Sequence, residues 1–228
     1  MNPSLVGSEM CIRDRNTSPL EIDIGIGDNT PFILPVSNTA SSVSNKGYII
    51  QSEKPVYASV RLTAGNQNQA GSLVSKGLSG LGQTFRVGTF TNLKTFTSNN
   101  RDYMNFVSVM ATENNTQVDF SDLPLDIIIE NNTPLSTVLD AGESYVIALN
   151  PAETTSNRDG LIGALVTSNK PIVVNCGSLN GSNFNDNGRD AGIDQIAPLE
   201  TIAIDGQEFS EYIFVRANGF DAIERPLI

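Results

Sequence analysis

The sequence predicts an all-β fold built from tandem β-sandwich-like units. From residue 16 onward, short apolar or alternating runs are separated by Asn, Gly, Asp, Ser, Thr and Pro, which is the pattern of strands joined by turns. No segment shows a convincing helical period. In addition, one strand-turn-strand pattern recurs about 116 residues later in the chain, a spacing close to the size of a β-sandwich domain.

The predicted strands follow from runs rich in Val, Ile, Tyr and Phe between turn signals such as Asp140-Ala141-Gly142 and Ser168-Asn169-Lys170-Pro171. Residues 65–82 are rich in Gly, Ser, Gln and Asn without clear periodicity. We expect them to form a long connection over one end of a sheet. The predicted strands are 47–51, 56–62, 105–111, 117–120, 126–130, 144–149, 161–166, 172–176 and 211–216.

The repeat aligns Gly47–Val56 with Gly163–Ile172. Both copies share the pattern Gly-x-aliphatic-aliphatic-x-Ser-x-Lys-Pro-aliphatic, in which proline fixes the backbone of a turn between two strands. The repeat predicts a first, incomplete unit over 16–104, a second unit over 105–222, and the truncated start of a further unit over 223–228. A propeller of four-stranded sheets is the architectural alternative.

Charge and residue types argue against several functions. The 228 residues include 14 Lys+Arg against 25 Asp+Glu, a net charge of −11, which repels nucleic acid backbones and anionic lipids. No apolar run approaches the roughly 18 residues of a membrane span, so we expect no membrane insertion. The chain has no His, which removes histidine acid–base catalysis and imidazole metal ligands. We therefore predict that the protein is not an enzyme.

The two cysteines have different settings. Cys176 ends the apolar run Ile172–Cys176, where it shares one strand face with Ile172 and Val174, so we predict a buried structural thiol. Cys11 lies in residues 1–15, which look like a translated sequencing adaptor and are excluded from the fold argument as a non-native segment.

One loop has the spacing of a calcium-binding loop. Asn183, Asn185, Asn187 and Asp194 occupy positions 1, 3, 5 and 12, with Gly188 at position 6. Position 1 is Asn rather than Asp and position 12 lacks the bidentate Glu, so the sequence favours a solvated Asn/Gly turn over calcium. No other cofactor is expected.

Asp194 and Gln195 form the sharpest polar motif, because they stand between Ile193 and Ile196. A charge there must be exposed or hydrogen-bonded. Our preferred interpretation is a structural tether to neighbouring backbone or to Arg189; the alternative is a ligand-binding surface. A glycan-active enzyme would need paired acids in a cleft, and is the remote alternative.

Several ordered motifs, in residues 59–61, 69–77, 106–118, 142–147, 168–175 and 192–198, resemble the IgG Fc-binding-protein N-terminal domain family. The resemblance covers nearly all of residues 16–228. It is closest to versions in large secreted, surface-attached proteins of gliding flavobacteria and other Bacteroidetes, which are clients of type IX secretion.

This resemblance implies an extracellular or cell-surface location and a binding or adhesion role. The partner would be an extracellular protein or glycan, contacted by loops such as 65–82 and 180–192. A structural spacer that holds other domains away from the cell is the alternative. We map no antibody-contacting residue onto this sequence, so the resemblance does not identify the ligand.

Overall fold

The computed structural model describes residues 4–6, 20–27, 29–39, 41–44, 46–54, 56–64, 69–89, 92, 104–181, 190–199, 202–204 and 207–209. These residues form strands and short 3₁₀ turns, and the part described contains no α-helix. The prediction of an all-β fold is therefore confirmed.

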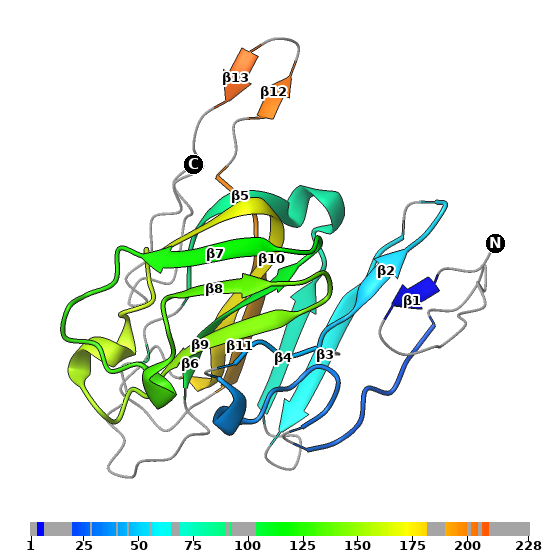
Figure 1. Ribbon diagram of the computed structural model, residues 1–228. Helices are drawn as coiled ribbons and strands as arrows, with labels where there is room; N and C mark the ends of the chain where they lie inside the picture. Colours follow the sequence, from blue (N-terminus) through cyan, green and yellow to red (C-terminus); the bar gives the residue numbers. More distant parts are fainter. Residues whose placement is uncertain are drawn as a thin grey trace, which may run out of the picture.

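Seven strands make one antiparallel sheet, and the others form three two-stranded ribbons (Figure 1). The bounds are β1 (Ser4–Val6), β2 (Ile49–Gln51), β3 (Ser59–Ala64), β4 (Gln69–Val74), β5 (Leu81–Arg86), β6 (Asn105–Ala111), β7 (Thr116–Ser121), β8 (Ser136–Leu139), β9 (Ser144–Leu149), β10 (Leu165–Gly181), β11 (Asp190–Ile196), β12 (Ile202–Ile204) and β13 (Gln207–Phe209), with 3₁₀ turns η1 (Val36–Asn38), η2 (Gly77–Gly80), η4 (Glu130–Asn132) and η5 (Thr155–Arg158).

Strand β10, 17 residues long, organises the large sheet. Its first part, from Leu165 to Ser168, pairs with β7, and its second part, from Ile172 to Ser178, pairs with β6. On its other side it pairs first with β5 and then with β11. The register with β5 shifts between Thr167 and Ile172. Proline lacks a backbone donor, so Pro171 belongs at such an irregularity rather than in a regular ladder.

The bend in β10 is repeated in the neighbouring strands. β6 and β7 follow one another along the same side of β10, interrupted at residues 112–115. β8 and β9 follow them in turn, interrupted at 140–143. β6 gives way to β7, and β9 to β8, at one level along β10, which we call the corner; β5 passes this level unbroken and pairs with β10 at 165–167 and at 172–173. The corner divides the sheet into a first half-sheet of β8, β7, early β10 and β5, and a second of β9, β6, late β10 and β11.

Two side chains join the turns at 112–115 and 140–143. The Asn114 Oδ1 accepts a hydrogen bond from the Ala141 N–H at 3.0 Å, and the Asp140 Oδ1 accepts one from the Asn115 N–H at 3.0 Å. Asn115 has φ 55°, a left-handed conformation that Asn tolerates better than most residues. The two turns therefore hold each other in register.

The bend of β10 is tied to the same turns. The Lys170 Nζ donates to the Asn114 carbonyl. The Asn169 Oδ1 accepts from the Gln117 N–H at 2.8 Å, and the Asn169 carbonyl accepts from the Gln83 Nε2 at 3.1 Å. The turn residues of three different chain segments thus form one hydrogen-bonded corner.

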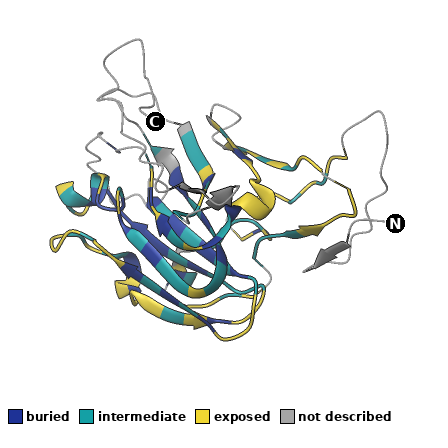
Figure 2. Cartoon of the chain, turned by 90° about the horizontal axis from the view of Figure 1, so that it is seen from above, coloured by how far each residue is buried: buried dark blue, intermediate teal, exposed yellow. Residues whose placement is uncertain are grey.

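The two half-sheets share a single apolar core, seen as the dark blue strands in Figure 2. Phe120 of the first half-sheet and Tyr145 of the second place their ring centroids 6.3 Å apart. Strand β6 alternates buried and half-buried positions along its length. Core members on the strands are Phe85, Val107, Val109, Ala111, Val118, Phe120, Leu139, Tyr145, Ile147, Leu149, Val166, Ile172, Val174 and Cys176.

The repeated Ser-x-Lys segment makes the same local hydrogen bond in both copies. Gly47 and Gly163 have φ of 98° and 82°. Ser52 and Ser168 each donate to the carbonyl of the lysine two residues later, at 2.5 and 2.7 Å. The pairing differs, because β2 pairs only with β1 in the described chain whereas β10 lies in the large sheet. The repeat of whole units remains a prediction.

The predicted unit boundary at 104/105 lies between strands that share a sheet, since β5 pairs with β10. Residues 1–15 contribute β1, and nothing in the pairing tests their proposed origin. The strand predicted at 211–216 and the segment 223–228 lie outside the described residues.

Three local expectations are wrong. Residues 69–82 form β4, η2 and the start of β5 rather than one long connection, because β4 pairs with β3 and β5 pairs with β10. Residues 126–130 form turns and a single bridge at Ile129 instead of a strand. Residues 161–164 form a turn rather than a strand, and 165–166 belong to β10, the same strand that contains the predicted strand 172–176.

The contribution of buried side-chain hydrogen bonds to stability can be tested at Asn157, which is fully buried. Its Oδ1 accepts from the Ile128 N–H, and its Nδ2 donates to the carbonyls of Ile128 and Asn150, all at 2.8–2.9 Å. Asn157→Ala removes these three bonds and leaves the part-buried Ile128 N–H and carbonyl without this partner, whereas the Asn150 carbonyl keeps the Glu153 N–H, so we expect the free energy of unfolding to fall by about 1.5–3 kcal/mol. Chemical denaturation measures this change in the free energy of unfolding.

The matched control is Asn114→Ala at the exposed corner, with an expected loss of about 0.5–1 kcal/mol. Equal losses in the two variants would contradict the larger stabilising role of the buried Asn157 hydrogen bonds.

Candidate functional site

The outer faces of the two half-sheets differ in character. On the first, the Gln117 Nε2 donates to the Ser136 Oγ at 2.8 Å, and the Ser136 Oγ donates to the Asp119 Oδ1 at 2.6 Å. On the second, β6 places Phe106 and Met110 outward, and this face is covered by the β3–β4 hairpin and by residues 29–47. We call residues 29–47, described except for 40 and 45, the covering segment.

Lys46 holds the covering segment in shape. Its Nζ donates to the Asn29 Oδ1 at 2.6 Å, the Thr30 carbonyl at 2.5 Å and the Ile33 carbonyl at 3.1 Å. All three ammonium donors are therefore engaged. At Gly47 an added Cβ would lie 2.3 Å from the Met110 Cε, so the end of that side chain would have to move, and the φ of 98° disfavours any side chain at this position.

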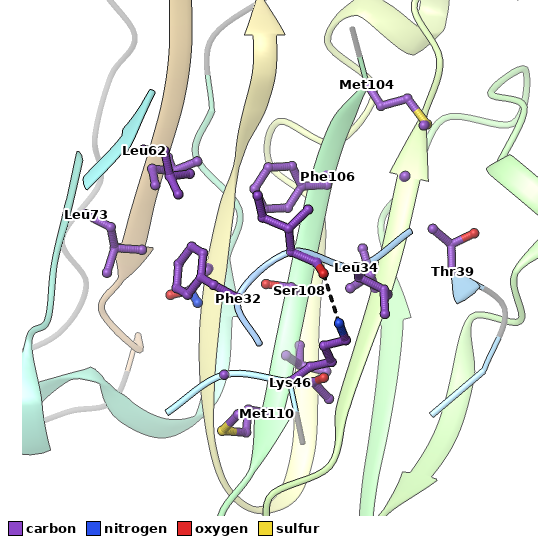
Figure 3. A pocket seen from close by; sticks show the side chains of 18 residues that line it. Phe32, Leu34, Thr39, Lys46, Leu62, Leu73, Met104, Phe106, Ser108 and Met110 are labelled. Atoms are coloured by element: carbon purple, nitrogen blue, oxygen red, sulfur yellow. Dashed lines mark hydrogen bonds between the residues drawn. The ribbon is translucent and has the colours of Figure 1, made fainter. Parts of the chain in front are cut away.

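A cavity of about 160 Å³ remains between the covering segment and the second half-sheet. Figure 3 shows Phe32 and Leu34 of the covering segment grouped with Phe106 of β6 around it. Packed protein interiors rarely leave voids larger than one water molecule. The lining residues are Phe32, Ile33, Leu34, Thr39, Lys46, Gly47, Leu62, Leu73, Met104, Phe106, Ser108, Val109, Met110, Ser144, Val146, Ala148, Asn175 and Ile193.

One buried polar atom in the cavity wall lacks a partner. Asn175 lies opposite Ser108 on β6 and Gln195 on β11, on the outward side of β10. Its Oδ1 is buried and accepts no hydrogen bond. Buried polar atoms are nearly always paired, so the Asn175 Oδ1 is one of the few exceptions in the described part of the chain.

The predicted pair Asp194 and Gln195 lies on β11 beside the turn after β4. The Asp194 Oδ1 is 3.0 Å from the Lys76 Nζ, and the Gln195 Oε1 accepts from the Lys76 N–H at 2.5 Å. Gln195 is buried and Asp194 is exposed. An added Cβ on Gly80 would lie 3.0 Å from the Gln195 Nε2. The two side chains thus connect β11 to the β4–β5 connection through Lys76; Arg189, the partner expected from sequence, lies outside the described residues.

Only Asp194 of the four predicted calcium ligands is described. Asn183, Asn185 and Asn187 lie outside the described residues. Within the described ranges, no three His, Cys, Asp or Glu side chains are grouped to hold a metal ion. The calcium loop remains a prediction.

Cys176 is buried, which confirms its predicted core position. Its Sγ donates to the Gly88 carbonyl at 2.7 Å. Burial raises the pKa of this thiol to about 12. A thiol held protonated in this way is a poor nucleophile.

Comparison with known protein families gives one match. A model of the family described as IgGFc binding protein matches residues 70–223. The chain belongs to this family. No curated protein and no solved structure matches the chain.

In this IgGFc-binding family member, the matched region begins in β4 and includes every strand of the large sheet. The covering segment and β3 precede the match. Families of this kind are binding proteins rather than enzymes, and they are typically secreted. In the part of the chain that is described, no helix has the length and hydropathy needed to cross a membrane.

Sequence reasoning missed the cavity. The available signal was β6, where Phe106, Val107, Val109, Met110 and Ala111 are apolar on both faces. A strand with two apolar faces is buried on both sides, which requires a covering element. The residues that supply it, such as Phe32, lie more than 70 positions earlier in the chain.

The pH dependence of the free energy of unfolding tests the burial of Cys176. The thiol of the unfolded chain ionises near pH 8.5, whereas the native thiol stays protonated up to about pH 12. Between these values the unfolded state binds fewer protons, so the free energy of unfolding falls as pH rises, by about 1.4 kcal/mol per pH unit from this group. We expect Cys176→Val to remove this contribution in urea unfolding between about pH 9 and 11. Equal pH slopes for the two proteins would contradict the burial; Cys11 is common to both and cancels.

Thermal unfolding tests the calcium alternative for residues 183–194. Because the sequence favours a solvated turn, we expect the same melting temperature in millimolar calcium and in excess chelator. Specific binding to the folded state would raise it through linkage. A calcium-dependent rise of several degrees would overturn the turn interpretation.

Proposed function

We propose that the protein is a non-catalytic extracellular binding or adhesion module of a large bacterial cell-surface protein. The family match over residues 70–223 carries this proposal, because the family is defined by binding. The partner is an extracellular protein, with a surface glycan as the second possibility. The alternative role, a spacer that holds other domains away from the cell, predicts no ligand.

The surface of β4, η2 and β11 is the best-supported contact site. The two segments that we expected to contact a ligand, 65–82 and 180–192, adjoin in the fold: Gly71 of β4 packs against Ala191 of β11, and Lys76 pairs with Asp194. Leu78 on η2 is 85% exposed, two residues from this ion pair. An exposed apolar side chain beside partly exposed charges is typical of a protein interface with an apolar centre and polar rim.

Binding measurements on single variants test the proposal. The family description names IgG Fc, so purified Fc is the first ligand to use in biolayer interferometry, with enzymatically deglycosylated Fc to separate protein from glycan contacts. We expect Leu78→Asp to weaken binding by about tenfold or more, since it places a charge at the centre of the contact.

The matched control is Leu125→Asp, because Leu125 is also fully exposed but lies in the β7–β8 connection. It should leave binding unchanged. Equal loss in both variants would contradict the assigned surface. No binding to Fc or to a panel of serum and matrix proteins and glycans would contradict the binding role and favour the spacer.

A further inference from the structure

We propose that β2 is the acceptor edge for one strand of a second copy of this chain, and that the strand it accepts is β13. Copies thus join head to tail, each contributing one strand to the next. The contact uses neither Leu78 nor Lys76, so the inference does not depend on the protein-binding role.

The hairpins β3–β4 and β10–β11 have the same pairing register. Under the offset of 116 that aligns the two Ser-x-Lys-Pro motifs, four consecutive pairs of the first hairpin fall on four consecutive pairs of the second. In β3–β4 these are Ser59 with Val74, Val60 with Leu73, Arg61 with Ser72 and Leu62 with Gly71; in β10–β11 they are Asn175 with Gln195, Cys176 with Asp194, Gly177 with Ile193 and Ser178 with Gly192. By this alignment β2 and β3 are the counterparts of early and late β10.

Apolar residues that are buried on β10 have exposed counterparts at β2. Ile50 is 45% exposed, whereas its counterpart Val166 is fully buried. Val56 is 59% exposed, whereas its counterpart Ile172 is fully buried. On β10 these positions have paired strands on both sides, β5 with β7 at Val166 and β5 with β6 at Ile172. In the described chain β2 pairs only with β1, so its apolar residues mark an interaction surface that lacks a strand.

The edge of β2 accepts a strand in the register that the large sheet uses. Leu5 of β1 pairs with Ile50 in an antiparallel ladder. Phe85 of β5 and Phe120 of β7 pair with Val166, the counterpart of Ile50, in ladders of the same direction. Because residues 1–15 resemble a non-native segment, we infer that β1 holds the place of another strand.

The sequence of β13 makes it the counterpart of β5. Residues 82–85 are Gly-Gln-Thr-Phe and residues 206–209 are Gly-Gln-Glu-Phe, and each stretch follows its hairpin. β5 does not pair with the hairpin that precedes it but with β10. β13 pairs only with β12 in the described chain, and this ribbon projects beyond the large sheet (Figure 1). β13 is therefore the next strand available to a β10-like strand.

The partner is a second copy because acceptor and donor both belong to this chain. We expect Phe209 to lie opposite Ile50, as the fully buried Phe85 lies opposite Val166. Acceptor and donor are different surfaces, so the contact is heterologous and each copy can bind two others.

Sedimentation velocity of mixed variants tests this contact. All proteins carry Leu5→Pro, because proline disrupts the β1 ladder and frees β2. We expect this parent to form oligomers that grow with concentration. Ile50→Glu removes the acceptor and Phe209→Glu removes the donor, so each variant alone should be monomeric. Their equimolar mixture should form one-to-one dimers and nothing larger, since one acceptor and one donor remain.

Val138→Glu is the matched control, because Val138 is 55% exposed but lies on β8. It should leave the oligomers unchanged. Urea unfolding checks that each variant folds, and Val6→Pro replaces Leu5→Pro if that protein does not. A parent that is monomeric at every concentration, a mixture that stays monomeric, or equal loss in Val138→Glu overturns the proposal.

Cross-linking tests the register. With Cys11→Ser in all proteins, a copy with Gln51→Cys and a copy with Glu208→Cys should form a disulfide-linked dimer, because their counterparts Thr167 and Thr84 are paired. Replacing Glu208→Cys by Gln207→Cys shifts the thiol to the opposite face of the strand, so the dimer should be lost. Equal yields would overturn the register. These measurements use no Fc, so failure of the Fc experiment leaves them unaffected.

Discussion

The bend of β10 at residues 168–171 is the constraint on which the rest of the fold depends. A single 17-residue strand contributes to both half-sheets, so the chain on the side of β6 and β7 must turn at the same level, while β5 spans the bend on the other side. Asn114, Asp140, Asn169 and Lys170 make this possible by pairing the polar groups of each turn with those of the next. Because the corner is fixed, Phe120 and Tyr145 meet across the core.

The bend also gives the two outer faces different roles. The first half-sheet exposes a polar outer face, with Gln117, Asp119 and Ser136 bonded to one another. The outer face of the second half-sheet is apolar and needs the covering segment. The cavity arises because this cover is a loop held by Lys46 rather than a packed sheet. The family match begins only at residue 70, so the cover belongs to the part of the chain that the match does not reach.

The sequence was sufficient to predict the strands whose apolar residues alternate within the strand itself. β6 and β9 were placed at their observed bounds because Val107, Val109 and Ile147 alternate in registers set by the core. β4 was missed because Gly71 and Ser72 are residue types typical of a loop. In the structure they belong to a strand that packs closely on β11. Pro171 suggested that one strand ends and another begins at this position. In the structure β10 bends there and continues. The sequence singled out Asp194 and Gln195 as a polar motif. Their partner Lys76, which is 118 residues away from Asp194, could be identified only in the fold. The cavity depends on the covering segment, with Phe32, lying over the second half-sheet, which no local pattern encodes.

The central place of β10 in the sheet has a consequence for the order of folding. Strands β5, β6 and β7 are synthesised some 50–90 residues before the strand that joins them, so they emerge from the ribosome with unpaired edges. Their only early ladders are β6 with β9 and β7 with β8. Non-local pairing of this kind makes folding slow and leaves apolar strands open to aggregation. The large sheet can therefore be completed only after translation has passed Ile196, the end of β11.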